Sequence, residues 1–122
     1  METTVRKKTS FLKGRSKEAF AAELKLHLNA HATEAYIFGS FFSEDFDADS
    51  DLDLAIVANC ALPFHQRIQI FPELTQFLDQ NNVPVDVLIY TPAEFEELQL
   101  EGRESKVGFW KNFISSSKKI YP

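Results

Sequence analysis

The residues of this 122-residue chain that could do chemistry begin with Gly39 and Ser40, which follow the apolar pair Ile37-Phe38. Glycine has no side chain, so the backbone can turn sharply there and come close to a ligand. Ser40 adds a hydroxyl and its own N–H. A helical turn over residues 40–44 would also point unpaired N–H groups outward, where they attract phosphate. The sequence therefore predicts a phosphate-binding turn at Gly39-Ser40.

Two carboxylates, Asp51 and Asp53, follow Ser40 after ten intervening residues. Side chains two apart on a strand point to the same face, and carboxylates placed so repel each other unless a cation or proton lies between them. Asp86 lies inside a later apolar run, where a buried carboxylate is costly unless it is paired or metal-bound. Oxygen ligands of this kind suit Mg²⁺. If the two strands are neighbours, the three carboxylates could hold two ions for nucleotidyl transfer.

This pattern resembles the DNA polymerase beta superfamily of nucleotidyltransferases. More narrowly, it is similar to the minimal nucleotidyltransferases (MNT) that pair with HEPN proteins in prokaryotic toxin–antitoxin modules. The match runs from about Glu34 to the C-terminus, and it includes a middle helix broken at Pro72 and the strand Val85-Asp86-Val87. It also includes the ending from Phe109 to Ile114 and on to Ile120-Tyr121.

The resemblance implies a role for each residue. Ser40 and the Gly39 backbone would hold the triphosphate, with ATP as the expected nucleotide. Asp51 and Asp53 would bind the Mg²⁺ ions that bridge the phosphates. Asp86 would bind the second metal and help to deprotonate the acceptor hydroxyl. The acceptor implied is a tyrosine of a HEPN toxin, with this chain as the antitoxin and a bacterial or archaeal origin.

The sequence departs from the family after Gly39-Ser40, where members often carry an Arg-x-Arg-Gly stretch. Here the residues are Phe41-Phe42-Ser43-Glu44-Asp45, so positive charge would have to come from Arg67, Arg103, Lys106 or Lys111. This departure favours an alternative, a catalytically weak or inactive module that neutralises a partner by direct binding. A third hypothesis, nucleotide transfer to a small molecule, lacks a second domain to hold that substrate.

Two other groups of polar residues, an acidic run and a histidine pair, do not match a known metal site. An EF-hand loop that starts at Asp45 needs Gly at position 50 and Glu at position 56, but Ser50 and Ile56 stand there. His27 and His31 share a helical spacing, yet the sequence offers no third ligand for zinc. We therefore interpret the outer acidic residues as a solvated loop and the histidines as ordinary surface or helix-end residues.

Hydrophobic spacing predicts the elements that must position these residues. We expect a helix from Ser16, a helical region over 64–80 split at Pro72, and a helix from Thr91-Pro92 whose apolar side extends to Ile114. We expect strands over residues 34–38, 52–57, 83–90 and 118–121. This order predicts an α/β (α+β) fold, a mixed sheet of three to four strands flanked by helices. Residues 16–122 would form one domain, behind a basic and flexible segment over 1–15.

Composition narrows the function classes. The formal net charge is −5 and the basic residues concentrate in the first 17 positions, so the acidic body argues against an extended nucleic-acid surface. No apolar run is long enough for a membrane span, and the N-terminus has no secretory signal. Cys60 is the only cysteine, which excludes a disulfide framework. We expect a cytoplasmic protein, with oligomerisation left open.

Overall fold

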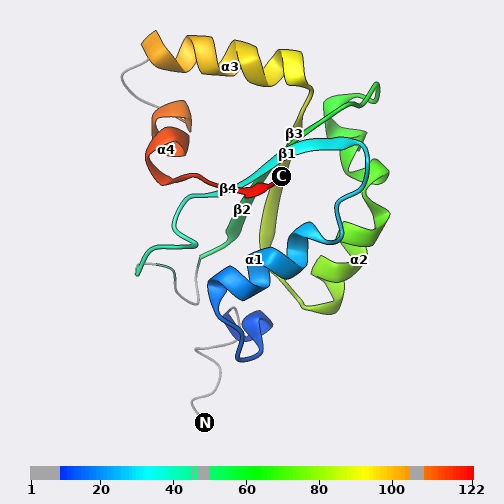
Figure 1. Cartoon of the computed structure of the whole chain (residues 1–122), viewed down its shortest axis with the longest axis vertical. Coiled ribbons are helices and arrows are strands. Elements are labelled where there is room, and N and C mark those ends of the chain that lie inside the picture. The colour runs from blue at the N-terminus through cyan, green and yellow to red at the C-terminus, as the bar shows by residue number, and fades with distance from the viewer. Residues whose placement is uncertain (1–8, 45, 47–49, 105–108) are drawn as a thin grey trace.

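The computed structural model of the chain describes residues 9–44, 46, 50–104 and 109–122. Its centre is a four-stranded mixed sheet with the order β3-β2-β1-β4 (Figure 1). The strands are β1 (Ala32–Phe38), β2 (Leu52–Ala58), β3 (Val85–Tyr90) and β4 (Lys118–Tyr121). β1 runs antiparallel to β2 and β4, while β2 and β3 are parallel. The predicted mixed sheet flanked by helices is confirmed, and β3 and β4 are its edges.

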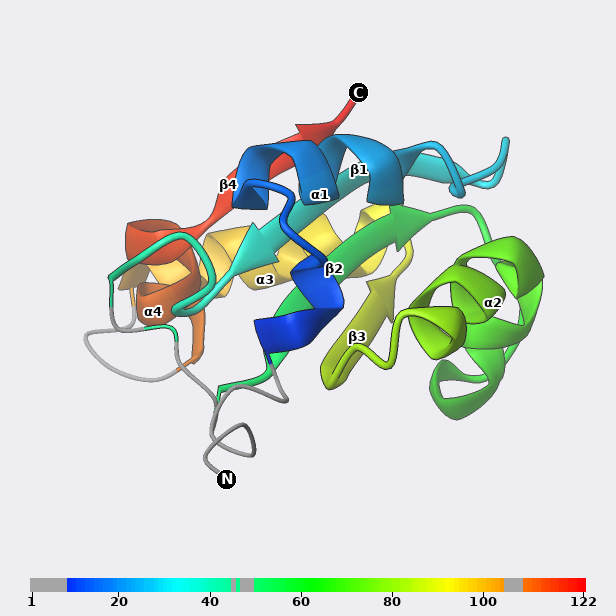
Figure 2. The same ribbon diagram turned by 90° about the horizontal axis from the view of Figure 1, so that it is seen from below.

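Helices cover both faces of this sheet. One face carries α1 (Lys17–Lys25) and α2 (Pro72–Gln80), and the other carries α3 (Pro92–Glu104) and α4 (Phe109–Ser116), as Figures 1 and 2 show. Two short 3₁₀ helices, η2 (Thr9–Leu12) and η3 (Phe64–Ile70), precede α1 and α2. None of the helices described is long and apolar enough to cross a membrane. The result is a sheet with one layer of helices on each side.

The helix starts follow the predicted capping residues. The Ser16 hydroxyl accepts a hydrogen bond from the N–H of Ala19, and Pro72 opens α2 where the helical region was expected to split. Thr91 and Glu94 form a capping box, in which the Glu94 N–H donates to Thr91 Oγ1 and the Thr91 N–H donates to Glu94 Oε1. The single C-terminal helix expected from the apolar pattern is instead two helices, α3 and α4. Val107, which falls within the range of that expected helix, lies outside the described residues.

Strand alternation sorts the core into two clusters. On β2, the side chains of Leu52, Leu54 and Ile56 are fully buried on the α1/α2 side. Ala55 and Val57 belong to the second cluster, under α3 and α4. The strand expected over residues 52–57 thus buries Leu52 and Leu54 on one of its faces. The same alternation turns Asp53 toward α3 and α4.

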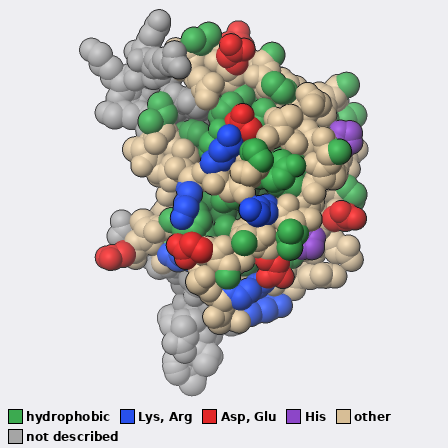
Figure 3. Space-filling model, in the orientation of Figure 1, with side chains coloured by type: hydrophobic (Ala, Val, Ile, Leu, Met, Phe, Trp, Pro, Cys, Tyr) green, Lys and Arg blue, Asp and Glu red, His purple; other side chains and the backbone are tan. Residues whose placement is uncertain are grey.

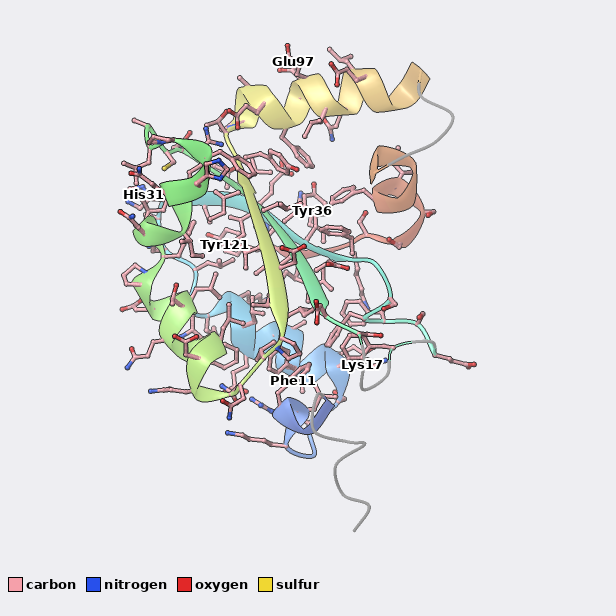
Figure 4. The ribbon with its side chains drawn as sticks, turned by 180° about the vertical axis from the view of Figure 1, so that it is seen from behind. Phe11, Lys17, His31, Tyr36, Glu97 and Tyr121 are labelled. Atoms are coloured by element: carbon pink, nitrogen blue, oxygen red, sulfur yellow. The ribbon has the colours of Figure 1, made fainter. Side chains whose placement is uncertain are left out.

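The expected flexible lead-in is wrong for residues 9–15. Phe11 is 1% exposed and its ring centroid lies 5.0 Å from that of Phe20 on α1 (Figure 4). The Arg15 guanidinium donates to the backbone oxygen of Phe11 and to the side chain of Asn81, and it forms an ion pair with Glu23. The sequence gives no signal for this segment, because a single buried phenylalanine has no periodicity. Residues 1–8 lie outside the described part of the chain.

Candidate active site

The predicted site residues meet at one end of the sheet, where β1 ends and β2 and β3 begin. Phe38 pairs with Asp53 across the antiparallel β1–β2 ladder. Asp53 in turn pairs with Asp86 across the parallel β2–β3 ladder. Residues in register on neighbouring strands point their side chains to the same face of the sheet. The two strands are about 4.8 Å apart. The structure therefore brings Gly39, Asp53 and Asp86 into one neighbourhood.

Gly39 has a positive φ of 77°, a conformation that side-chain-bearing residues rarely adopt. A Cβ at this position would also stand 2.3 Å from Oδ2 of Asp53. The sequence analysis predicted a close backbone approach to a ligand, and here the glycine backbone approaches the carboxylate itself. Glycine is therefore required at position 39 by backbone geometry and by the neighbouring side chain.

The described residues directly after Gly39 form no helix. They form consecutive turns, in which the N–H and the hydroxyl of Ser43 both donate to the Ser40 carbonyl at 2.9 Å. No hydrogen bond joins the Ser40 hydroxyl to another part of the chain that the structure describes. A phosphate would therefore meet the N–H groups and hydroxyl of a tight turn, without the dipole of a following helix.

Repulsion among the carboxylates is visible at Asp53. Its pKa is raised above the ordinary value, first by burial, then by the charge of Asp86 and then by that of Asp51. Asp51 is exposed and precedes the first residue of β2. Asp51 and Asp86 thus both act electrostatically on Asp53.

Asp86 differs from the sequence-based expectation in one respect. It was predicted to be a buried carboxylate that needs a cation to be tolerated, but its side chain is exposed. The reason is that β3 is an edge strand, on which the next residues of this face, Leu88 and Tyr90, are themselves only partly buried. The case for Asp86 therefore depends on its proximity to Asp53 rather than on the desolvation of its own charge.

The donor set suits a magnesium ion that is completed by substrate. Among the described residues, no three Asp, Glu, His or Cys side chains are arranged to enclose a metal. Mg²⁺ usually takes one or two carboxylates together with substrate phosphates and water. Asp53 and Asp86, in register and repelling each other, meet that requirement. The metal-binding role of Asp51, Asp53 and Asp86 stays a prediction.

Arg67 does not supply charge to this end of the sheet. The residue is 7% exposed, and its guanidinium donates to the backbone oxygens of Leu62 and Ile89 and to both carboxylate oxygens of Glu94. Ile89 lies near the end of β3, three residues beyond Asp86. Of the other basic residues considered, the side chains of Arg103, Lys106 and Lys111 lie outside those described.

Two lysines that the sequence analysis overlooked lie against the turn region. Lys17 Nζ donates to the Ser43 carbonyl at 3.0 Å and lies 5.2 Å from the ring centroid of Phe46. Lys118 Nζ lies 4.5 Å from the ring centroid of Phe42. Figure 4 places Lys17 beside the chain that links β1 to β2. The phenylalanines that follow the Gly-Ser pair could have indicated these lysines from the sequence, because aromatic rings attract ammonium groups.

A separate hollow of about 180 Å³ lies between α1 and β4. It is lined by apolar residues and by Lys25, Lys118, Lys119 and Glu18. Figure 3 shows basic side chains around hydrophobic ones on this face of the molecule. Its walls include Ala21 and Ile120, which belong to the α1/α2 side of the sheet. Because Asp53 faces the other side, we place the candidate active site at the carboxylates and not in this hollow.

Comparisons with known proteins identify the family of the chain. The family model for polymerase beta nucleotidyltransferases matches residues 23–121. A protein from Sulfolobus solfataricus assigned as a nucleotidyltransferase superposes with a TM-score of 0.50 and 20% identity, over 73% of this chain and 77% of that chain. A toxin–antitoxin structure with AMP-PNP gives a TM-score of 0.49 and 15% identity, over 85% of this chain and 70% of that chain. No curated protein matches significantly.

Proposed function

The chain belongs to the polymerase beta family of nucleotidyltransferases, and on that basis we propose that it transfers an adenylyl group from ATP to a protein hydroxyl with the help of Mg²⁺. The observation that carries the proposal is the register pairing of Asp53 with Asp86 beside the Gly39-Ser40 turn. We further propose that the acceptor belongs to a HEPN-type toxin and that this chain is its antitoxin. That narrower assignment rests on the resemblance of the sequence to the minimal nucleotidyltransferases.

We assign each residue the role that the resemblance to the family implies. Ser40 and the Gly39 backbone bind the triphosphate at the turn. Asp51, Asp53 and Asp86 would hold Mg²⁺, which when bound neutralises phosphate charge and stabilises the departing pyrophosphate. Asp86 accepts the proton of the acceptor hydroxyl. The acceptor oxygen then bonds to the α-phosphorus, and the bond to the bridging oxygen breaks with its electron pair going to pyrophosphate.

The position of Asp86 favours a protein acceptor. Its carboxylate is exposed on the edge strand β3, where the side chain of a folded partner can approach it. A small-molecule acceptor would need walls of its own to be oriented at this edge. Lys17, which donates to the Ser43 carbonyl, supplies positive charge near the turn where the family's arginines are missing.

A second candidate function is neutralisation of the partner by contact, with little or no turnover. The specific observation in its favour is that the turn after Ser40 has no arginine, while Arg67 is already engaged by Glu94. Both hypotheses use the same fold. They differ in whether the carboxylates are needed for the partner to be inhibited.

A transfer assay separates the two. The chain is incubated with Mg²⁺ and the purified product of the neighbouring open reading frame, with ATP labelled at either the α- or the γ-phosphate. Adenylyl transfer labels the partner from α-labelled ATP only, and the double variant Asp51→Asn/Asp53→Asn abolishes it. Glu97→Gln, an exposed acidic residue on α3, serves as the matched control. Inhibition of the partner that survives the double variant, without label, would instead establish the contact mechanism.

A further inference from the structure

The end of α4 is tied to the Gly39 turn by one hydrogen bond. The N–H of Gly39 donates to Ser116 Oγ at 2.9 Å. The sheet register explains this contact. Ile37 pairs with Lys118 in the antiparallel β1–β4 ladder, and if that pairing is extended by two residues, Gly39 lies opposite Ser116. Ser116 is still part of α4. Its hydroxyl therefore takes the place of the backbone acceptor that a longer β4 would provide.

Packing fixes where this hydroxyl lies. Phe113 is 4% exposed and its ring centroid lies 5.2 Å from that of Phe38, the residue before Gly39. Ser116 follows Phe113 by three residues, so both lie on the same side of the helix. The N–H of Ser117 donates to the Phe113 carbonyl at 2.8 Å and holds the last turn of α4 together. The aromatic contact thus positions Ser116 beside the turn.

Gly39 is held from two sides. Its α-carbon lies against the carboxylate of Asp53, and its N–H is bonded to Ser116. A glycine at a φ of 77° has no side chain to restrict it, so neighbouring contacts must fix its peptide plane. The peptide that leads from Gly39 into Ser40 carries the Ser40 N–H. The orientation of that N–H therefore depends on the contacts that hold Gly39.

We propose that Ser116 is a positioning residue for nucleotide binding. By accepting the Gly39 N–H, it fixes the turn so that the Ser40 N–H and hydroxyl face the triphosphate. Ser116 acts through Gly39 and does not itself contact the phosphates. This inference rests on the proposed function, because it assigns the turn to the nucleotide.

The test uses the full chain with Ser116→Ala, Ser116→Thr and the neighbouring control Ser115→Ala. Affinity for an ATP analogue with a non-hydrolysable α–β bridge is measured by calorimetry in the presence of Mg²⁺. Ser116→Ala should weaken binding by roughly three- to tenfold, the effect expected from one hydrogen bond. Threonine keeps the hydroxyl and should restore the affinity, and Ser115→Ala should bind like the wild type. Wild-type affinity in a folded Ser116→Ala variant would overturn the proposal.

A second measurement does not depend on nucleotide. Hydrogen exchange of the Gly39 amide, followed by NMR, should accelerate at least threefold in Ser116→Ala and stay near wild type in Ser116→Thr, because only the alanine variant lacks the acceptor. Unchanged exchange would contradict the positioning role. A wild-type chain that binds no nucleotide would instead refute the proposed function, and Gly39 exchange would then decide whether Ser116 holds the turn. Should Ser116→Ala not fold, the isosteric pair Ser116→Thr and Ser116→Val gives the same comparison.

Discussion

The backbone of Gly39 lies against the carboxylate of Asp53, so closely that a Cβ at position 39 would stand 2.3 Å from Oδ2. The two residues come from separate parts of the sequence pattern, and they meet because Phe38 and Asp53 are register partners. The turn proposed to bind phosphate and the carboxylate proposed to bind metal are thus in direct contact. A change in either one is expected to move the other.

Replacement of Gly39 by alanine tests this contact. The new methyl group would have to displace the Asp53 carboxylate, and the left-handed backbone would add about 1–2 kcal/mol of strain. We expect Gly39→Ala to lower the free energy of unfolding, measured with urea, and to weaken Mg²⁺-dependent nucleotide binding more than tenfold. The binding loss follows from the displaced carboxylate.

Gly14 provides the matched control for that variant. It also has a positive φ, 82°, but no atom lies within 4 Å of a Cβ built on it. Gly14→Ala should therefore show the backbone strain alone and bind nucleotide like the wild type. If the two variants lost the same free energy and both kept nucleotide affinity, the contact with Asp53 would have no functional role.

Removal of the charge at Asp86 should stabilise the protein when no metal is present. Asp86 helps to raise the pKa of Asp53, so Asp86→Asn should bring that pKa down toward its ordinary value. Relief of a like-charge pair on neighbouring strands is worth about 0.2–1 kcal/mol. We expect a higher melting temperature without Mg²⁺ and a smaller stabilisation when Mg²⁺ and nucleotide are added. A variant that responds to Mg²⁺ and nucleotide as the wild type does would remove Asp86 from the site.

The pH dependence of this effect has a defined sign. Because the folded pKa of Asp53 is raised, the folded state binds its proton more tightly than the unfolded state does. The contribution of Asp53 to stability is therefore present at low pH and is lost as pH rises through the folded pKa. Asp86→Asn should reduce this loss. NMR titration of the Asp53 carboxyl carbon in the two proteins measures it directly.

Much of the fold could be predicted because it depends on local patterns. The stripe of Phe20 and Leu24, the break at Pro72 and the alternation at Leu52 and Leu54 each have a short-range physical cause. The pairing of Asp53 with Asp86 was inferred only on the condition that the two strands are neighbours. That condition is a property of the sheet order, which local patterns do not determine.

The residues that the sequence analysis misjudged all depend on distant contacts. Asp86 is exposed because β3 is an edge strand, and Phe11 is buried because it packs on Phe20. Arg67 was a candidate for binding phosphate, yet its charge is satisfied by Glu94. Ser116 reaches Gly39 only through the folding of α4 onto the sheet. Phe11 and Phe20 are nine residues apart with no repeating pattern, and the other partners are far apart in sequence, so residue type and spacing gave no signal.

The ion pair of Arg67 with Glu94 should make stability sensitive to acid. Hydrogen bonds from Arg67 and Thr91 hold the pKa of Glu94 at about 2, below its ordinary value of 4.5. A lowered folded pKa means that this stability is present above pH 4.5 and is lost as pH falls toward 2. Glu94→Gln should lower the free energy of unfolding by about 1 kcal/mol near neutral pH. This is less than a buried hydrogen bond to a charged group contributes, because the Glu94 side chain is 42% exposed.

Urea unfolding of Glu94→Gln between pH 7 and pH 3 measures that prediction. The difference between variant and wild type should shrink as pH falls below 4.5, because the unfolded wild type then binds a proton at Glu94 that the folded protein, with its pKa near 2, does not bind. Glu97→Gln, on the same helix but exposed, should show no pH-dependent difference. A constant difference across the whole range would mean that the charge of Glu94 does not contribute.

The packing of Phe113 should control both the stability of α4 and the site. Its ring centroid lies 5.3 Å from that of Tyr36 and 5.2 Å from that of Phe38, and Figure 4 shows Tyr36 between the sheet and α3. Phe113→Ala should lower the free energy of unfolding by about 3–5 kcal/mol, which is a large share of the stability of a small domain. Phe113→Leu, which keeps most of the apolar volume, should fold with a smaller loss.

The neighbouring Ile114 gives the control, because it is 57% exposed and its truncation to alanine should change stability by no more than about 0.5 kcal/mol. Trp110, the only tryptophan of the chain, lies on α4 and reports its environment by fluorescence. In Phe113→Leu, α4 should loosen, so the Gly39 amide should exchange faster and nucleotide should bind more weakly. Ile114→Ala should leave exchange and binding unchanged. If Phe113→Leu lost stability but kept wild-type Gly39 exchange and nucleotide affinity, α4 would support the fold without positioning the turn.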